Sequence, residues 1–378
     1  MTESLSRERQ RNTLRTRAGA ISLAVVLGLG IASRVVFGGF NQVVAAPETL
    51  VTQTTQAAPS TVTGLSVADV VAKANPAVVT ITNLAQIPAG RHGGLSADTP
   101  QPVGKGSGFI LDTKGHIVTN SHVVEGATEL SVEFSDGTTA TAKLIGRDPF
   151  QDVAVIQVDP SATVKLPGVS TLGSSASLRV GDPVVALGTP LGEFTNSATD
   201  GIVGGLDRSL DTGANYRLPN LIQHDAPISP GDSGGPLLDL NGNVIGMNVA
   251  KADTSMLMGG GQAEGIGFAI AVDAVKDVAN QLIAKGEVAR PYLGVKSQVD
   301  DQGRAVIETT NDGPAVTAGL RQGDIITALG GQKVDDAHPL INLLFQHKPG
   351  DKVSLTVNRG GTDQKIDVTL GTRPTESQ

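Results

Sequence analysis

The chain has 378 residues, which is enough for two domains with sizeable cores. Its net charge of −8 argues against nucleic acid as a partner, because phosphate contacts need clustered Lys and Arg and the only dense basic run is N-terminal. It has no cysteine, 47 glycines, 20 prolines and 3% aromatic residues, which excludes disulfides and thiol catalysis and favours short strands joined by turns.

The N-terminus combines a basic segment, residues 1–17, with an apolar one. The basic residues are Arg7, Arg9, Arg11, Arg15 and Arg17. The apolar stretch starts at Ala18 and, if Arg34 snorkels, continues to Phe40, which is long enough to span a bilayer. We therefore expect a single-pass anchor over residues 18–40, with the basic side in the cytoplasm and the remaining chain outside it. A cleaved signal peptide is the alternative, because Ala45 and Ala46 offer a cleavage site.

Residues 41–65 are rich in Thr, Ala, Gln and Pro without periodicity, which predicts a flexible linker. A short helix should begin at Ser66 and end before Pro76. The Gly- and Pro-rich stretch 85–106 predicts a mobile loop.

Short apolar runs then alternate with turn pairs such as Asp136-Gly137 and Asn241-Gly242, a pattern typical of antiparallel sandwiches and barrels. The clearest runs are 77–82, 109–111, 116–119, 130–134, 153–158, 184–187 and 244–249. A helix over 273–285, capped by Gly286, should close a first domain of residues 66–290.

Three separated motifs carry residues suited to covalent catalysis. Ser233 lies in GDSGGPL, where glycines allow a tight turn and the N–H groups of Gly231 and Ser233 can converge on an oxyanion. His122 lies in VTNSHVV and offers the general base that an unactivated hydroxyl needs. Asp152 lies in FQDVAV, at the start of an apolar strand where a lone carboxylate is costly, so the His122 imidazole is its natural partner.

In this order and with these flanks, the motifs resemble the trypsin-like superfamily. Within it they resemble the bacterial HtrA (DegP-like) proteases, in the membrane-anchored actinobacterial type with one PDZ domain. GIGFAI at 265–270 agrees, and the resemblance covers roughly residues 66–371. It implies a mainly β protein, a chymotrypsin-like double β-barrel followed by a PDZ domain, behind an N-terminal transmembrane helix. It also implies that His122 is the base, that Asp152 orients it, and that Ser233 forms an acyl-enzyme.

An α/β-hydrolase is the competing interpretation, because GDSGG also fits a nucleophile elbow. That fold needs its acid and its histidine after the serine, yet only His338 and His347 follow, both in the C-terminal module. No alternation of strands with long helices surrounds Ser233 either. We expect the other histidines to be non-catalytic: His92 in the loop, His116 in a turn after Gly115, and His224 beside Asp225.

Asp232 departs from the HtrA pattern, which usually has Asn there. In trypsin-type enzymes this carboxylate pairs with a newly cut terminal ammonium, and no such terminus exists here. Ile202-Val203-Gly204-Gly205 looks like an activation sequence, but cutting there would split the enzyme. The hypothesis that follows is activation by loop rearrangement.

The specificity pocket, placed by the same resemblance, involves Ile228, Val249, Ala250 and Lys251. The segment Ala226–Pro230 before the nucleophile has no acid to pair with Lys or Arg, so the pocket should be apolar. We expect cleavage after small or medium aliphatic residues.

Residues 291–371 resemble a PDZ domain of the HtrA type, through YLGV at 292–295, GPA at 313–315 and AGLRQGDII at 318–326, and residues 372–378 form a tail. The N–H groups of Leu293, Gly294 and Val295 would cradle a peptide C-terminus. A helix near 339–347 would line the groove through Leu340 and Leu344. A small β-domain that only packs on the protease is the alternative, because groove and core positions share one pattern.

Together these features predict a serine endopeptidase that acts on misfolded or regulatory extracytoplasmic proteins, in quality control or a stress response. Its PDZ domain would bind peptide C-termini and bias the protease towards its working state. A peptide-binding holder with a largely idle protease site is the alternative. No metal or organic cofactor is implied, because no His and carboxylate cluster has ligand spacing. The family resemblance also allows a homotrimer.

Overall fold

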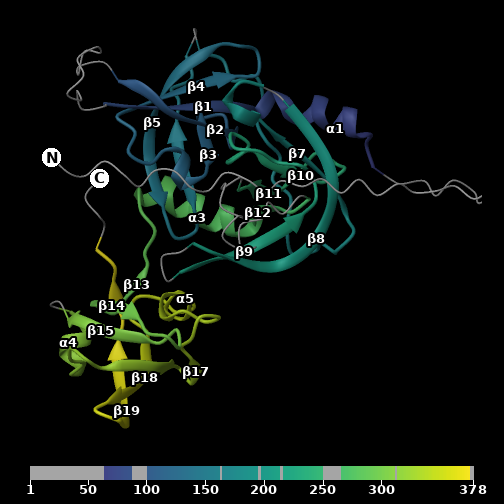
Figure 1. Cartoon of the computed structure of the whole chain (residues 1–378). Coiled ribbons are helices and arrows are strands. Elements are labelled where there is room, and N and C mark those ends of the chain that lie inside the picture. Colours follow the sequence, from purple (N-terminus) through teal and green to yellow (C-terminus); the bar gives the residue numbers. More distant parts are fainter. Residues whose placement is uncertain are drawn as a thin grey trace, which may run out of the picture. The chain divides into compact units, whose positions relative to one another are not determined.

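The computed structural model describes residues 64–86, 100–161, 164–194, 197–212, 216–249, 265–310 and 313–374. These residues form two closed six-stranded barrels and a smaller C-terminal sheet (Figure 1), which confirms the mainly β class. The expected anchor, residues 18–40, lies outside the described residues, as does most of the linker. In the described ranges, no helix has both the length and the hydrophobicity needed to cross a bilayer.

The first barrel follows a short helix, α1 (Val67–Ala74), and a 3₁₀ turn, η1 (Asn75–Ala77). Ser66 is the helix N-cap, because its hydroxyl accepts a hydrogen bond from the N–H of Asp69. The barrel strands are β1 (Val78–Ala85), β2 (Gln101–Ile110), β3 (His116–Thr119), β4 (Glu129–Phe134), β5 (Thr139–Asp148) and β6 (Val153–Gln157). They pair in the order β1-β2-β3-β6-β5-β4. Side chains of a strand point alternately into and out of the barrel, and in β4 the inward-pointing Leu130, Val132 and Phe134 are buried.

Two predictions about this barrel are wrong. Residues 101–106 of the expected loop belong to β2 and pair with β1, while residues 87–99 lie outside the described ranges. One of their glycines marks close packing, since a Cβ at Gly106 would lie 2.7 Å from the Val123 side chain. His116 is the first residue of β3, not part of the turn, and its ring is 2.7 Å from Asp112.

The second barrel consists of β7 (Pro183–Gly188), β8 (Ser197–Asp211), β9 (Arg217–His224), β10 (Pro236–Leu238), β11 (Val244–Asn248) and β12 (Gly267–Ala271). These strands pair in the order β10-β11-β12-β9-β8-β7. The stretch Ile202–Gly205 lies wholly inside β8. Helix α3 (Val272–Lys285) then contacts β5 and β6 of the first barrel and β11 and β12 of the second. It ends at Gly286, whose φ of 77° is left-handed, as predicted for a C-cap.

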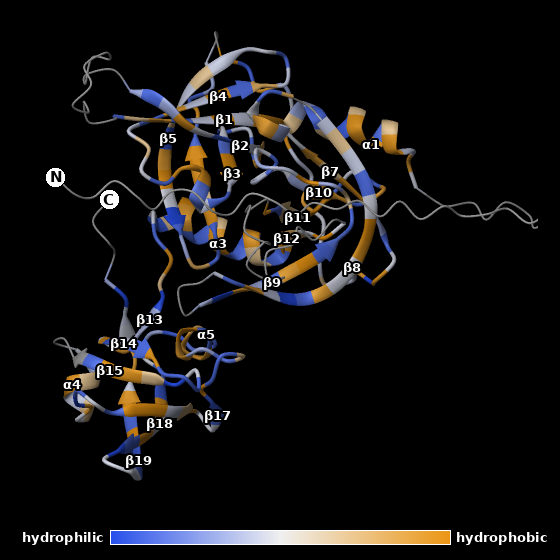
Figure 2. Ribbon diagram, in the orientation of Figure 1, coloured by the Kyte–Doolittle hydropathy of each residue, from blue (hydrophilic) through white to orange (hydrophobic). Residues whose placement is uncertain are grey.

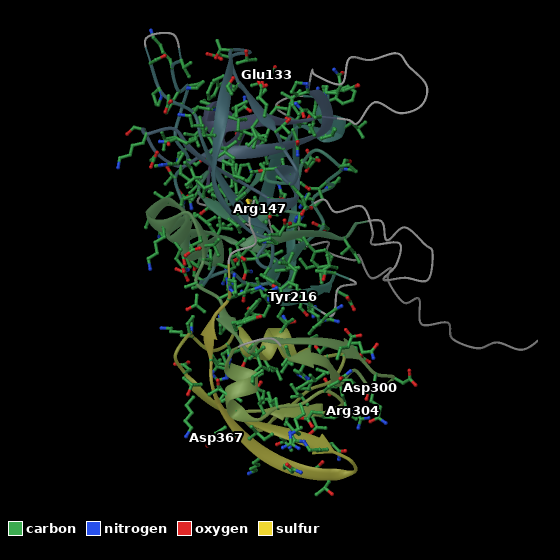
Figure 3. The ribbon with its side chains drawn as sticks, turned by 90° about the vertical axis from the view of Figure 1, so that its left-hand side faces the viewer. Glu133, Arg147, Tyr216, Asp300, Arg304 and Asp367 are labelled. Atoms are coloured by element: carbon green, nitrogen blue, oxygen red, sulfur yellow. The ribbon has the colours of Figure 1, made fainter. Side chains whose placement is uncertain are left out.

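The C-terminal module has a hydrophobic core of its own. Its elements are β13 (Pro291–Tyr292), β14 (Val295–Val299), β15 (Ala305–Thr310), α4 (Pro314–Ala318), β16 (Ile325–Leu329), β17 (Gln332–Lys333), α5 (Leu340–Leu344), β18 (Lys352–Arg359), β19 (Thr362–Thr369) and β20 (Gly371–Thr372). The main sheet has the order β14-β15-β16-β18-β19, with hydrophobic residues along β15 and β18 (Figure 2). An ion pair between Asp300 and Arg304, at 2.7 Å, closes the β14–β15 hairpin (Figure 3).

Candidate active site

The first barrel brings His122 and Asp152 together. His122 lies in the 3₁₀ turn η2 (Ser121–Val123) just after β3, and Asp152 immediately precedes β6. Because β3 pairs with β6, residues far apart in sequence meet at one end of the barrel. The Nδ1 of His122 is 2.8 Å from Asp152 Oδ2, and the His122 backbone N–H donates to Asp152 Oδ1 at 3.0 Å. The buried carboxylate therefore holds both the ring and the backbone of His122.

The backbone around Asp152 is braced on both sides. Asp152 has a left-handed φ of 53°, which is costly for a residue other than glycine. The side-chain amide of the fully buried Asn120 donates to the Asp152 carbonyl at 2.9 Å. The hydroxyl of Tyr216 (labelled in Figure 3) donates to the carbonyl of Phe150, and burial raises the Tyr216 pKa, so this donor stays protonated.

The predicted nucleophile follows a tight turn. The N–H of Asp232 donates to the Ser229 carbonyl at 2.9 Å, with Pro230 and Gly231 as the two central residues. Gly231 has φ +103°, so proline and glycine occupy the positions that a type II turn favours. A Cβ at Gly231 would lie 2.3 Å from the Thr189 carbonyl oxygen. Only glycine fits this position, and Ser233 follows two residues later at 4% exposure.

Every carbonyl of the turn from Ser229 to Ser233 accepts a hydrogen bond. The five donors are Asp232 N to Ser229 O at 2.9 Å, Leu191 N to Pro230 O at 2.6 Å, Ser107 Oγ to Gly231 O at 2.7 Å, Gly235 N to Asp232 O at 3.0 Å, and Ser107 N to Ser233 O at 2.7 Å. In a trans peptide the C=O and N–H point in opposite directions. Because Leu191 holds the Pro230 carbonyl, the N–H of Gly231 is directed away from Leu191.

One cavity of about 390 Å³ is lined by His122, Gly231 and Ser233. The structure thus brings together the predicted base, the nucleophile and one oxyanion donor, beside the His122–Asp152 pair. A base, a hydroxyl and converging backbone N–H groups are the parts that acyl transfer needs. Among the described residues, no cluster of His and carboxylates could hold a metal ion.

Of the predicted specificity residues, the two that the structure describes, Ile228 and Val249, do not line this cavity. Ile228 packs against the core of the second barrel, and the buried Val249 belongs to a different core cluster. Ala250 and Lys251 lie outside the described residues.

Asp232 is buried, at 7% exposure. Its Oδ2 accepts the Ser229 N–H at 2.8 Å, and its Oδ1 is so close to Gly188 that a Cβ there would approach it to 2.5 Å. No Lys, Arg or His side chain of the described residues forms an ion pair with it. Burial raises the pKa of Asp232 to about 6, so this carboxyl changes charge close to neutral pH.

Replacing Asp232 with Asn should stabilise the folded protein at pH 8 and far less at pH 4. The pKa is raised from 3.8 to about 6, so the folded state binds the proton more tightly than the unfolded state does. Below the unfolded-state pKa the carboxyl is protonated in both states and does not change the free energy of unfolding. Above the folded-state pKa its ionisation lowers the free energy of unfolding by about 3 kcal/mol, at about 1.4 kcal/mol per pKa unit. Thermal unfolding of the Asn variant, in a Ser233→Ala background that prevents self-digestion, measures the difference.

The control for this prediction is Asp159→Asn, because the Asp159 side chain is 78% exposed and should show no pH-dependent gain. A gain from Asp232→Asn that is equal at pH 4 and pH 8 would contradict a buried, titrating carboxyl.

The other histidines that the structure describes do not line this cavity. His224 is 1% exposed, and burial lowers its pKa to about 4. His338 and His347 contact Asp335 and Asp351 of the C-terminal module. His92 lies outside the described residues.

In the C-terminal module, the five residues expected to form the groove line one cavity. They are Leu293, Gly294, Val295, Leu340 and Leu344. Gly294 has φ +82°, a conformation that suits a close backbone approach. β14 ends the order of the main sheet, and such an edge can accept an added strand.

Sequence reasoning assigned no role to Ser107 or Asn120. The available signal was slight: Asn120 is a polar residue at the end of an apolar run, and Ser107 stands between Gly106 and Gly108. Both side chains are completely buried, which sequence alone does not reveal.

Comparison with known proteins gives consistent matches. Residues 106–247 match the trypsin-like peptidase domain, and residues 291–370 match the PDZ domain. Over 322 residues the chain is 41% identical to Protease Do-like 1, chloroplastic, of Arabidopsis thaliana, covering 80% of this chain and 71% of that protein. Over 334 residues it is 39% identical to Serine protease Do-like HtrA of Bacillus subtilis, covering 80% and 72%.

Two further similarities concern location and structure. A probable periplasmic serine endoprotease, DegP-like, of Pseudomonas savastanoi is 41% identical over 285 residues, which cover 72% of this chain and 57% of that protein. The solved structure of the HtrA-type protease AlgW with decapeptide is similar at a TM-score of 0.62 and 32% identity, covering 82% of this chain and 100% of that chain.

Proposed function

Because the chain belongs to the HtrA (DegP-like, or Do-like) family of serine endopeptidases, we propose that it cleaves peptide bonds through an acyl-enzyme on Ser233. His122 takes the proton from the Ser233 hydroxyl and later gives it to the leaving amine. Asp152 holds the ring with Nδ1 protonated, so that Nε2 can accept. The N–H groups of Gly231 and Ser233 stabilise the oxyanion.

The observation that carries this proposal is the state of the nucleophile turn. With its carbonyls bound elsewhere and the Gly231 N–H directed away from Leu191, the turn supports a resting site that already holds its oxyanion donors. The hydrogen bond from the Ser229 N–H to the Asp232 carboxylate takes the place of an ion pair with a newly cut N-terminal ammonium. The proposal therefore involves no zymogen cleavage, and a requirement for proteolytic trimming before Ser233 would contradict it. Activation by loop rearrangement stays a hypothesis.

The proposed substrates are misfolded or regulatory proteins outside the cytoplasm, and the proposed partner of the PDZ domain is a peptide C-terminus. The cavity lined by Leu293, Gly294 and Leu340 supports the second point, as does the similar structure of a relative with a decapeptide. An anchor over residues 18–40 and an extracytoplasmic location are supported by the basic and apolar N-terminus and by the periplasmic location in the names of relatives. A homotrimer is a further part of the proposal.

Labelling with a fluorophosphonate probe tests the proposed mechanism directly. The full chain should be labelled on Ser233, located by mass spectrometry after digestion, because an activated serine attacks phosphorus and the pocket stabilises the resulting oxyanion. Labelling of another serine, or of none, would contradict the proposal. An unlabelled chain that still suppresses aggregation of unfolded casein would indicate the holding function.

Cleavage should occur after small or medium aliphatic residues. The segment Ala226–Pro230 contains no acid to pair with a basic side chain, and Ala226 is buried while Ile228 is partly buried among apolar residues. Sequencing the fragments of digested casein gives the residue before each cut. A clear preference for Arg or Lys would refute an apolar pocket.

A further inference from the structure

Ser107, in β2 of the first barrel, forms three hydrogen bonds with the second barrel, two of them with the nucleophile turn. Its backbone N–H donates to the Ser233 carbonyl at 2.7 Å. Its hydroxyl donates to the Gly231 carbonyl at 2.7 Å and accepts the Thr189 N–H at 2.9 Å. The Ser107 carbonyl in turn accepts the Thr119 hydroxyl at 2.7 Å. Ser107 is 0% exposed, so water does not replace any of these bonds.

The hydroxyl acts on two successive peptide groups of the turn. It binds the carbonyl between Gly231 and Asp232 directly. It also fixes Thr189, which precedes the 3₁₀ turn η3 (Pro190–Gly192), and the Leu191 N–H of that turn holds the carbonyl between Pro230 and Gly231. Leu191 has a left-handed φ of 58°, a conformation that needs support from its surroundings.

The support for Thr189 continues into the first barrel. Its hydroxyl lies 2.7 Å from the Thr80 hydroxyl of β1, and both residues are buried. A chain of buried hydroxyls thus runs from β1 through Thr189 and Ser107 to Gly231. The Pro230 carbonyl and the Gly231 N–H belong to one planar peptide group. If Leu191 released that carbonyl, the peptide group could rotate, so the orientation of the Gly231 N–H depends on this chain.

We propose that Ser107 is a positioning residue for the oxyanion hole, whose hydroxyl fixes the Gly231 N–H in the orientation that receives the oxyanion. The inference rests on the proposed function of Ser233 and deepens it. Ser107 makes no contact with the reacting atoms and acts only through Gly231 and Thr189.

The test compares Ser107→Ala with the unmodified full chain, using an aliphatic peptide substrate and the matching peptide aldehyde, whose adduct with a serine carries an oxyanion. Losing a whole oxyanion donor costs roughly 10²–10³ in kcat. Misplacing one should lower kcat by about 10-fold or more, with KM within about 2-fold, because only the transition state uses the donor. The affinity for the aldehyde should fall by the same factor as kcat.

The matched control is Ser121→Ala, which removes another buried hydroxyl of the first barrel, one without a hydrogen-bond partner among the described residues. It should leave kcat and aldehyde affinity unchanged. Ser107→Ala also leaves two buried groups unpaired, which lowers the stability of the folded protein. If it does not fold, Ser107→Cys, which keeps a weak donor, is measured instead and should show a smaller loss of kcat and aldehyde affinity.

A lower unfolding midpoint with unchanged kcat and aldehyde affinity, in either variant, would overturn the positioning role and leave a structural one. Labelling of the unmodified chain separates this result from a failure of the proposed function. If Ser233 is labelled and peptide is cleaved, only the role of Ser107 is in question. If neither occurs, the proposed function itself fails.

Discussion

Ser233→Ala should lower kcat for an aliphatic peptide substrate by about six orders of magnitude, as removal of a catalytic serine does in a protease that works through an acyl-enzyme. The alanine has no hydroxyl to attack the carbonyl, so His122 has no proton to take. The remaining oxyanion donors can still assist attack by water, which leaves a small residual rate. Release of a fluorescent leaving group measures both rates, and unfolded casein tests a protein substrate.

The control is Ser135→Ala, a partly buried serine whose hydroxyl donates to Pro76 in the first barrel, which should retain full activity. Ser233→Ala should unfold at nearly the same temperature as the unmodified chain, so that the loss is not a loss of folding. Undiminished cleavage would remove Ser233 from the mechanism. Absence of cleavage by the unmodified chain would favour a holder.

Asp152→Asn should lower kcat by about 10⁴-fold, the loss typical of this change in a serine protease. Asp152 Oδ1 accepts the His122 backbone N–H at 3.0 Å, which leaves Oδ2, at 2.8 Å, for the ring Nδ1. In an asparagine, the amide oxygen keeps the backbone bond and the NH₂ group faces Nδ1. The ring must then carry its proton on Nε2, the atom that should accept the proton of Ser233.

The chain contains a matched control for this change. Asp112 and His116 form another Asp–His pair in the first barrel, with 2.7 Å between Oδ2 and Nδ1. Asp112→Asn should leave kcat unchanged, because neither residue of that pair lines the cavity of Ser233, and His116 begins β3 whereas His122 follows the other end of that strand. A loss in both variants, or in neither, would contradict the orienting role of Asp152.

The local motifs predicted much of this site. GDSGGPL predicts a tight turn before Ser233, and Gly231 does adopt a left-handed φ. The order of His122, Asp152 and Ser233 indicated the barrel fold, and the C-terminal cap at Gly286 was correct. These features are readable because each depends on a few adjacent residues with one conformational or chemical preference.

The failures have a common physical cause. Gly106 resembles part of a loop in sequence, but in the structure it allows β2 to pass close to Val123. The assignment of Ile228 and Val249 to a specificity pocket stays a prediction, because these residues only show packing against two different hydrophobic clusters. The sequence shows which residue stands at a position. It does not show which distant residue packs closely against it in the folded protein.

The sequence by itself determined the enzyme family, the candidate catalytic residues and the succession of a barrel domain and a PDZ domain, because these are carried by short motifs. Only the tertiary structure decided how the nucleophile turn is held. The bond from Ser107 to Gly231 joins residues 124 positions apart, and the burial that raises the pKa of Asp232 comes from packing of the second barrel. Hydrogen bonds and desolvation of this kind depend on distances that exist only after the two barrels have formed.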